Sequence, residues 1–148
     1  MNKNILHIPS LAYFNNDWDV LQNFLKHRGN PPYHIDNDLD LAYAPIKSIG
    51  NLKSVGGSLK LRYSEIKDLG NLTSVGGSLY LNDAQIKDLG NLTSVGCNLY
   101  LRNTSIKDLG NLTSVKGHLV LQNTPLSKKI TEHDIRSQVN VEGGIYFK

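Results

Sequence analysis

Apolar residues recur along most of this chain in sets that repeat every 20 residues. The stretch from Ile46 to Val55 returns with few changes at Ile66 to Val75, at Ile86 to Val95 and at Ile106 to Val115. Self-similarity at a fixed short period is the sequence signature of solenoid proteins, in which each repeat forms one coil. Because a single coil is too small to enclose a core, the apolar positions of successive coils are expected to stack on one another.

Each copy leads into a turn that contains glycine and then into a triplet of the form apolar, variable, apolar, such as Leu79-Tyr80-Leu81. Alternation with a period of two predicts a β-strand. Equivalent strands of stacked coils lie side by side, so the pattern predicts one parallel sheet of about six short strands. The variable residues at the strand centres, which are expected to point away from the core, are Asp40, Lys60, Tyr80, Tyr100, Val120 and Tyr146.

Two helices are expected outside the regular coils. The first, over about residues 16–28, has its apolar residues on one face, ends before Gly29, and is expected to cap the solenoid. The second opens with Thr131 to Asp134, which has the form of a capping box, and runs to Gln138 inside an insertion that lengthens the last coil to 26 residues. The predicted fold class is therefore an α/β solenoid, with an N-terminal cap over residues 1–35 and coils over residues 36–148.

The apolar spacing within a coil, L-x-L-x-x-A-x-I-x-x-L-x-x-L-x-x-V from Leu79 to Val95, resembles the leucine-rich-repeat family at the short end of its range of repeat lengths. The string Gly-Asn-Leu-Thr-Ser-Val-Gly-Gly also resembles the coils of receptor L domains and of short repeat proteins found in bacteria and bacteriophages. This resemblance covers the chain from about Asp36 onward and implies a right-handed coil.

The chain departs from the leucine-rich-repeat pattern at the inward asparagine position. Small residues stand there instead: Ala44, Ser64, Ala84, Thr104 and Thr124. A different asparagine recurs at the opposite turn, and its stack is expected to satisfy the backbone groups that stacked coils bury. The members of that stack are Asn51, Asn71, Asn91 and Asn111.

Composition narrows the class of protein. The chain is 39% hydrophobic and 20% charged with a net charge of +3, which is typical of a globular domain and too weak a charge to indicate nucleic-acid binding by itself. It contains no apolar run near the roughly 18 residues that span a bilayer, and Asn, His and Pro interrupt the start before a signal-peptide core forms. One cysteine, Cys97, fits a reducing compartment, so a cytoplasmic location is expected.

Comparison of the repeats with one another distinguishes positions that serve stacking, which are the same in every copy, from positions that are free to bind a partner. The positions that vary between copies concentrate on the outer side of the predicted sheet. Tyrosine beside arginine is the composition enriched at binding hot spots. The residues predicted to bind a partner are Lys60, Arg62, Tyr63, Tyr80, Asn82, Tyr100, Arg102, His118 and Tyr146. A plainer interpretation is that β-propensity alone favours aromatic residues on an exposed strand.

Catalytic motifs are absent from the sequence: the histidines are scattered, and neither a phosphate loop nor a nucleophile elbow occurs. We therefore expect a non-enzymatic module that binds an unidentified protein, with no cofactor, no metal and no membrane partner. The family resemblance suggests a phage-encoded adaptor, or an inhibitor of a host defence protein acting in the host cytoplasm.

Two alternatives stay open. Arginines interleaved with tyrosines also suit single-stranded nucleic acid, which such a face binds through phosphate contacts and base stacking. The repeats also suit a purely structural protein that is monomeric or forms a weak homodimer through the last strand, Ile145 to Phe147.

Overall fold

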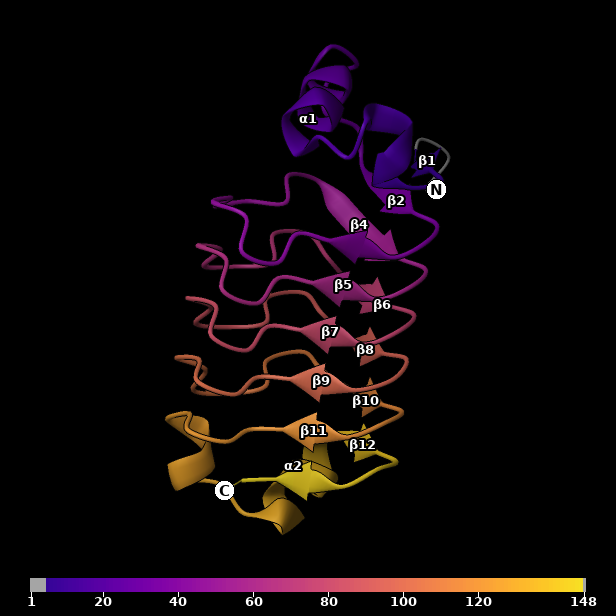
Figure 1. The fold of residues 1–148 in the computed structure, drawn as a ribbon. Helices are drawn as coiled ribbons and strands as arrows, with labels where there is room; N and C mark the ends of the chain where they lie inside the picture. The colour runs from indigo at the N-terminus through magenta and orange to yellow at the C-terminus, as the bar shows by residue number, and fades with distance from the viewer. Residues whose placement is uncertain (1–4, 148) are drawn as a thin grey trace.

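In the computed structural model, which describes residues 5–147, the chain forms a parallel β-solenoid of about four turns. Coils of about 20 residues stack along one axis, which confirms the predicted repeat (Figure 1). Helix α1 (Trp18–Lys26) lies at the N-terminal end of the stack and helix α2 (Glu132–Gln138) at the C-terminal end. Among the described residues, no helix is both long enough and apolar enough to cross a membrane.

The solenoid has two parallel sheets, whereas the sequence predicted one. The predicted sheet is present with six strands: β3 (Leu39–Asp40), β5 (Leu59–Lys60), β7 (Leu79–Tyr80), β9 (Leu99–Tyr100), β11 (Leu119–Val120) and β13 (Ile145–Tyr146). The second sheet has seven strands: β1 (Leu6–Ile8), β2 (Tyr33–Ile35), β4 (Leu52–Val55), β6 (Ser74–Val75), β8 (Ser94–Val95), β10 (Ser114–Val115) and β12 (Asn140–Val141).

The alternation of apolar and polar residues did not predict the seven-stranded sheet, because its strands are too short to show such a pattern. In the regular coils each of these strands is a Ser-Val pair. Hydrogen bonds nevertheless run from coil to coil there: the Thr73 amide donates to the Lys53 carbonyl, and the Gly76 amide donates to the Val55 carbonyl, both at 2.8 Å. The prediction of a single sheet was therefore wrong, since backbone pairing on this side depends on the stacking and not on a strand-like sequence.

The core consists of columns of identical residues, as the repeat predicted. Equivalent strands pair without a register shift, for example Leu59 with Leu79 and Leu79 with Leu99. The leucine and isoleucine side chains at the inward positions of residues 59–121 are at most 3% exposed. At the inward position where leucine-rich repeats carry asparagine, Thr104 and Thr124 donate their hydroxyls to carbonyls of their own coil, those of Leu101 and Leu121.

The N-terminal segment extends the solenoid further than predicted. Helix α1 begins at Trp18 because the Asp17 carboxylate accepts the amides of Asp19 and Val20, and Asn16 before it is left-handed at φ +56°. The helix is therefore shorter than the predicted residues 16–28, and it buries Leu21 and Leu25. Ahead of it, β1 pairs in parallel with β2 and becomes the edge of the seven-stranded sheet.

The C-terminal coil has its own closing helix. Thr131 and Asp134 form the predicted capping box at the start of α2, and Ile135 packs into the core with no exposed surface. From the same helix, the Arg136 guanidinium donates to the carbonyls of Val141 and Gly143 at 2.6 and 3.0 Å. Backbone acceptors of the last coil are thereby satisfied without a further strand.

Candidate binding surface

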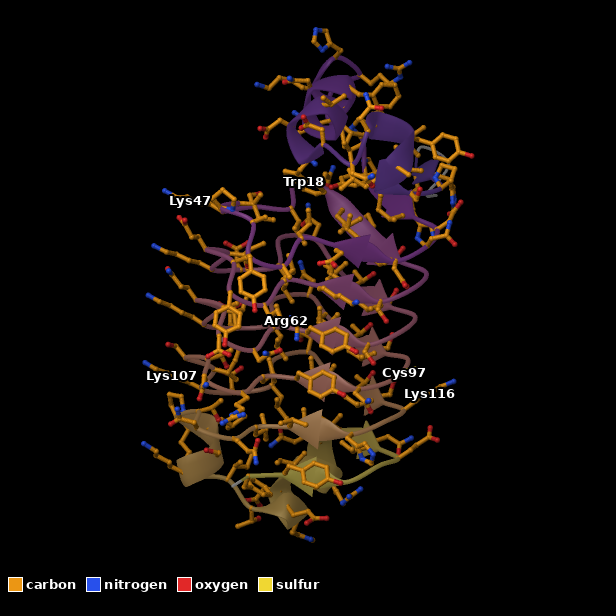
Figure 2. The ribbon with its side chains drawn as sticks, in the orientation of Figure 1. Trp18, Lys47, Arg62, Cys97, Lys107 and Lys116 are labelled. Carbon is orange, nitrogen blue, oxygen red and sulfur yellow. The ribbon has the colours of Figure 1, made fainter. Side chains whose placement is uncertain are left out.

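An open groove of about 510 Å³ runs across the outer side of the six-stranded sheet, and we call it the tyrosine groove. Each strand contributes its central residue and the residue two positions later, which point to the same face because side chains alternate along a strand. Its lining residues are Arg62, Tyr80, Asn82, Tyr100, Arg102, Val120, Gln122 and Tyr146. Figure 2 shows Arg62 among the side chains that project from this side of the coils.

Most of the residues predicted from the sequence meet in this groove. Arg62, Tyr80, Asn82, Tyr100, Arg102 and Tyr146 line it, whereas Lys60, Tyr63 and His118 do not. Val120 and Gln122 line it and were not predicted. Their signal is positional, because they stand one repeat after Tyr100 and Arg102, and residue type alone gave no reason to select them. Lys148 continues one of these columns in the sequence and lies outside the described residues.

The two central tyrosines stack on each other. The ring centroids of Tyr80 and Tyr100 are 4.8 Å apart and their planes differ by 13°. On the strand before Tyr80, Lys60 places its Nζ atom 5.9 Å from the centroid of the Tyr80 ring. On the strand after Tyr100, Val120 pairs in register with Tyr100. The faces that the two rings turn toward each other are therefore covered, and Lys60 lies over the Tyr80 ring. The Tyr100 hydroxyl accepts the Asn98 side-chain amide at 3.0 Å, so its proton, the Tyr80 hydroxyl and the ring edges are left for a partner.

The two arginines of the groove carry its positive charge. Arg62 and Arg102 are exposed, and the ion pairs found among residues 5–147 do not include either of them. A guanidinium offers five donors in a planar fork that matches a carboxylate or a phosphate. Two acidic residues beside the same sheet, Asp38 and Asp40, lie at its N-terminal end, where they face a separate hollow beside Leu11 and Ala12. A third, Asp83, stands just beyond β7, where its carboxylate and Arg102 both act on Tyr63.

A second tyrosine pair stands just beyond the strand ends. Tyr43 and Tyr63 stack at 4.9 Å with planes 7° apart, although 67% and 51% of their surface is exposed. Both adopt a left-handed backbone, at φ +63° and +58°, which is unfavourable for a bulky residue. The equivalent residues of the later coils are Asp83, Asn103 and Asn123, whose residue types tolerate this conformation. Their side chains form a ladder, in which Asn103 donates to Asp83 and Asn123 donates to Asn103.

The hydroxyl of Tyr63 faces the first member of that ladder. A hydrogen bond with the Asp83 carboxylate, together with the negative charge of that group, raises the pKa of Tyr63 above its ordinary value. The neutral hydroxyl of Tyr63 is therefore the donor and the Asp83 carboxylate the acceptor. Exposed aromatic residues with this backbone in two coils, where the later coils hold Asp or Asn residues that tolerate it better, are typical of a functional position.

His118 belongs to a ladder that supports the framework. Each member of its column accepts the amide of the equivalent residue one coil later: Asp38 from Ser58, Ser58 from Ser78, Ser78 from Asn98, Asn98 from His118, and His118 from Gly144. The His118 ring also packs edge-to-face with the ring of Tyr146, which lines the groove, and the two ring centroids are 5.5 Å apart. His118 therefore positions Tyr146 and the last coil from outside the groove.

Lysine recurs at one position of four successive coils, and this lysine column lies on a different flank of the solenoid, the lysine flank: Lys47, Lys67, Lys87 and Lys107. Figure 2 shows Lys47 and Lys107 extending from the same side of the stack into solvent. The acidic residues next to this column form turns: the carboxylates of Asp68, Asp88 and Asp108 accept the amides of Gly70, Gly90 and Gly110 at 2.8–2.9 Å. Those glycines adopt positive φ, which the turn requires and which glycine tolerates without strain. These contacts assign the acidic column to the framework.

No protein-family model, no curated protein and no solved structure matches this chain.

Proposed function

We propose that this protein is a non-enzymatic binding module that recognises another protein through the tyrosine groove. The observation that carries the proposal is the gathering of three tyrosines and two arginines from four coils along one groove of about 510 Å³. Tyrosine and arginine are the residues most enriched among those that dominate binding energy at protein interfaces. The rigid parallel stacking of the coils holds these side chains in place before a partner arrives, which lowers the entropic cost of association.

The arrangement of the rings favours a protein over a nucleic acid. Single-stranded nucleic acids bind by stacking their bases on free aromatic faces. Tyr80 and Tyr100 cover each other at 4.8 Å, and Lys60 lies over the other face of Tyr80. The edges and hydroxyls that remain suit the mixed apolar and hydrogen-bonding contacts of a protein surface.

Charge defines the partner further. Arg62 and Arg102 lie in the groove without an ion pair among the residues that the structure describes. A carboxylate of the partner gains two parallel hydrogen bonds from each guanidinium it meets. We therefore propose a partner segment that combines acidic side chains with apolar ones.

Replacement of the central tyrosines tests this proposal. Partners are captured from a lysate of the native host with the unmodified chain and identified by mass spectrometry, and their affinity is then measured with purified protein. Tyr80→Ala and Tyr100→Ala are each expected to weaken binding by more than about 2 kcal/mol, because truncation of an aromatic anchor removes a central part of the interface.

The matched control for the tyrosine variants is Lys67→Ala with Lys87→Ala, which removes two exposed side chains from the lysine flank. This variant is expected to keep full affinity. Equal affinity of the unmodified chain and both tyrosine variants would exclude the groove as the binding site, provided that thermal melting shows all the chains to be folded.

A salt titration tests the nucleic-acid alternative. The unmodified protein is expected to show no binding to single-stranded DNA or RNA at low salt, since its two central tyrosines stack on each other instead of offering free faces to bases. If it binds, the slope of log affinity against log salt should be flatter in the Arg62→Ala/Arg102→Ala variant, by about 0.7 for each phosphate that this variant no longer neutralises. A steep slope that disappears in this variant would overturn the protein-binding proposal.

The finer expectations rest on the sequence resemblance. We propose on that basis that the coil is right-handed and related to leucine-rich repeats, and that the protein is a phage-encoded adaptor or inhibitor of a host defence protein. The proposed cytoplasmic location rests instead on the single cysteine, Cys97. The assembly alternative, a weak homodimer through Ile145 to Phe147, predicts concentration-dependent sedimentation that an Ile145→Lys variant abolishes. We expect a monomer at all concentrations.

A further inference from the structure

Three side chains that offer metal ligands meet at the outer side of the N-terminal edge of the seven-stranded sheet. His7 lies in β1 and pairs in register with His34 in β2, so both side chains leave the same face of the sheet. Asp36 follows β2 directly. One ligand atom from each of His7, His34 and Asp36 lies within 4.8 Å of the others.

We propose that His7, His34 and Asp36 bind a divalent transition-metal ion of the zinc class. Two imidazoles and one carboxylate are the ligands that such ions take in proteins, with a water molecule completing a tetrahedral set. This surface is separate from the tyrosine groove, and the inference does not depend on the proposed function.

Two of the three distances between ligand atoms match those expected around a metal ion. The Nδ1 atom of His7 is 3.4 Å from Oδ1 of Asp36, and Nε2 of His34 is 3.3 Å from the same oxygen. Metal–ligand bonds of 2.0–2.1 Å at tetrahedral angles place neighbouring ligand atoms about 3.3 Å apart. A hydrogen bond between a charged imidazole and a carboxylate is shorter, at about 2.7–2.9 Å.

A further residue orients one of the ligands. The Nδ1 atom of His34 is 2.5 Å from the hydroxyl of Ser54, which lies beside it in register on β4. When His34 donates its Nδ1 proton to Ser54, its Nε2 lone pair faces the Asp36 carboxylate. Two acceptors then face each other, and a cation between them turns that repulsion into attraction. Metal-bound histidines regularly have such a partner on the second nitrogen.

The consequence of metal binding is a clamp between the N-terminal segment and the first coil. Strand β1 is an edge strand of three residues, separated from β2 along the chain by helix α1. An ion held by His7 on β1 and by His34 and Asp36 on β2 cross-links the two. A ligand that binds only the folded chain stabilises it according to the ratio of its concentration to its dissociation constant.

Calorimetric titration of the full untagged chain with ZnCl2 tests the proposal, with thermal melting as a second measurement. We expect one ion per chain and a higher melting temperature in the presence of zinc. His34→Ala and Asp36→Asn should each weaken zinc binding by at least about tenfold and remove the thermal shift. Ser54→Ala should weaken it by about 10- to 100-fold while all three ligands remain, as loss of an orienting partner does.

His27→Ala and His133→Ala serve as controls, since both remove an exposed histidine elsewhere in the chain. Neither variant should change zinc binding. The absence of one-to-one binding by the unmodified chain would overturn the proposal, and so would zinc binding that His34→Ala and Asp36→Asn leave intact. Co²⁺ provides a third measurement, because the intense visible absorption of a tetrahedral site should appear with the unmodified chain and be lost in His34→Ala.

Discussion

Deletion of residues 1–30 is expected to convert the protein into an aggregating species. The deletion removes β1, whose backbone is tied to the first coil by the Leu6 amide on the Pro32 carbonyl and by the Asp36 amide on the Ile8 carbonyl. It also removes α1, which lies against that coil through a hydrogen bond from Gln22 to the Tyr33 hydroxyl. The truncated chain presents an unpaired β2 edge beside uncovered apolar residues, and such an edge is a template for association.

Size-exclusion chromatography and thermal melting measure this outcome. Asn23→Ala in the full chain is a matched control, because it alters an exposed position of α1 and leaves the cap in place. This control should behave like the unmodified protein. A truncated chain that is soluble, monomeric and as stable as the full chain would show that the N-terminal segment has no capping role.

Leu81→Ala and Leu101→Ala are each expected to lower the free energy of unfolding by about 2–5 kcal/mol. Both leucines have no exposed surface and stand in columns whose members above and below are leucines as well. Coils that are held by their neighbours have little freedom to close the cavity that a truncated side chain leaves. The loss is therefore expected toward the upper part of that range.

Urea denaturation followed by circular dichroism gives the free energy of unfolding for these variants. Lys87→Ala, an exposed substitution in the same region, should change it by less than about 0.5 kcal/mol. If both leucine variants lose less than about 1 kcal/mol, the columns do not carry the stability of the solenoid.

Those features of the fold that a local pattern encodes could be predicted from the sequence. The 20-residue period placed the five strands that contain Asp40, Lys60, Tyr80, Tyr100 and Val120, and the last coil of 26 residues placed the strand that contains Tyr146. The capping box at Thr131 placed the second helix, because its chemistry lies within four consecutive residues. The outward positions of the six-stranded sheet followed from alternation alone.

Features that depend on contacts between distant residues could not be predicted. The seven-stranded sheet arises from stacking of Ser-Val pairs, and β1 becomes a strand only because β2 lies beside it. The meeting of His7 with His34 and Asp36 depends on that same register. The left-handed backbone of Tyr43 and Tyr63 could not be predicted either, since a bulky side chain is poorly suited to that conformation.

The uniform register of the middle coils affects how such a protein can evolve by losing whole repeats. Leu59, Leu79, Leu99 and Leu119 are interchangeable as neighbours, because every pairing between them has the same geometry. Loss of one period by recombination between repeats, for instance residues 76–95, would shorten the rod by about 4.8 Å and leave each remaining core residue with a neighbour of the same type. The outer side has no such equivalence, since the same event would bring Lys60 next to Tyr100 and rearrange the groove. Recombination between repeats can thus change the binding surface one whole coil at a time while the core of the solenoid is preserved.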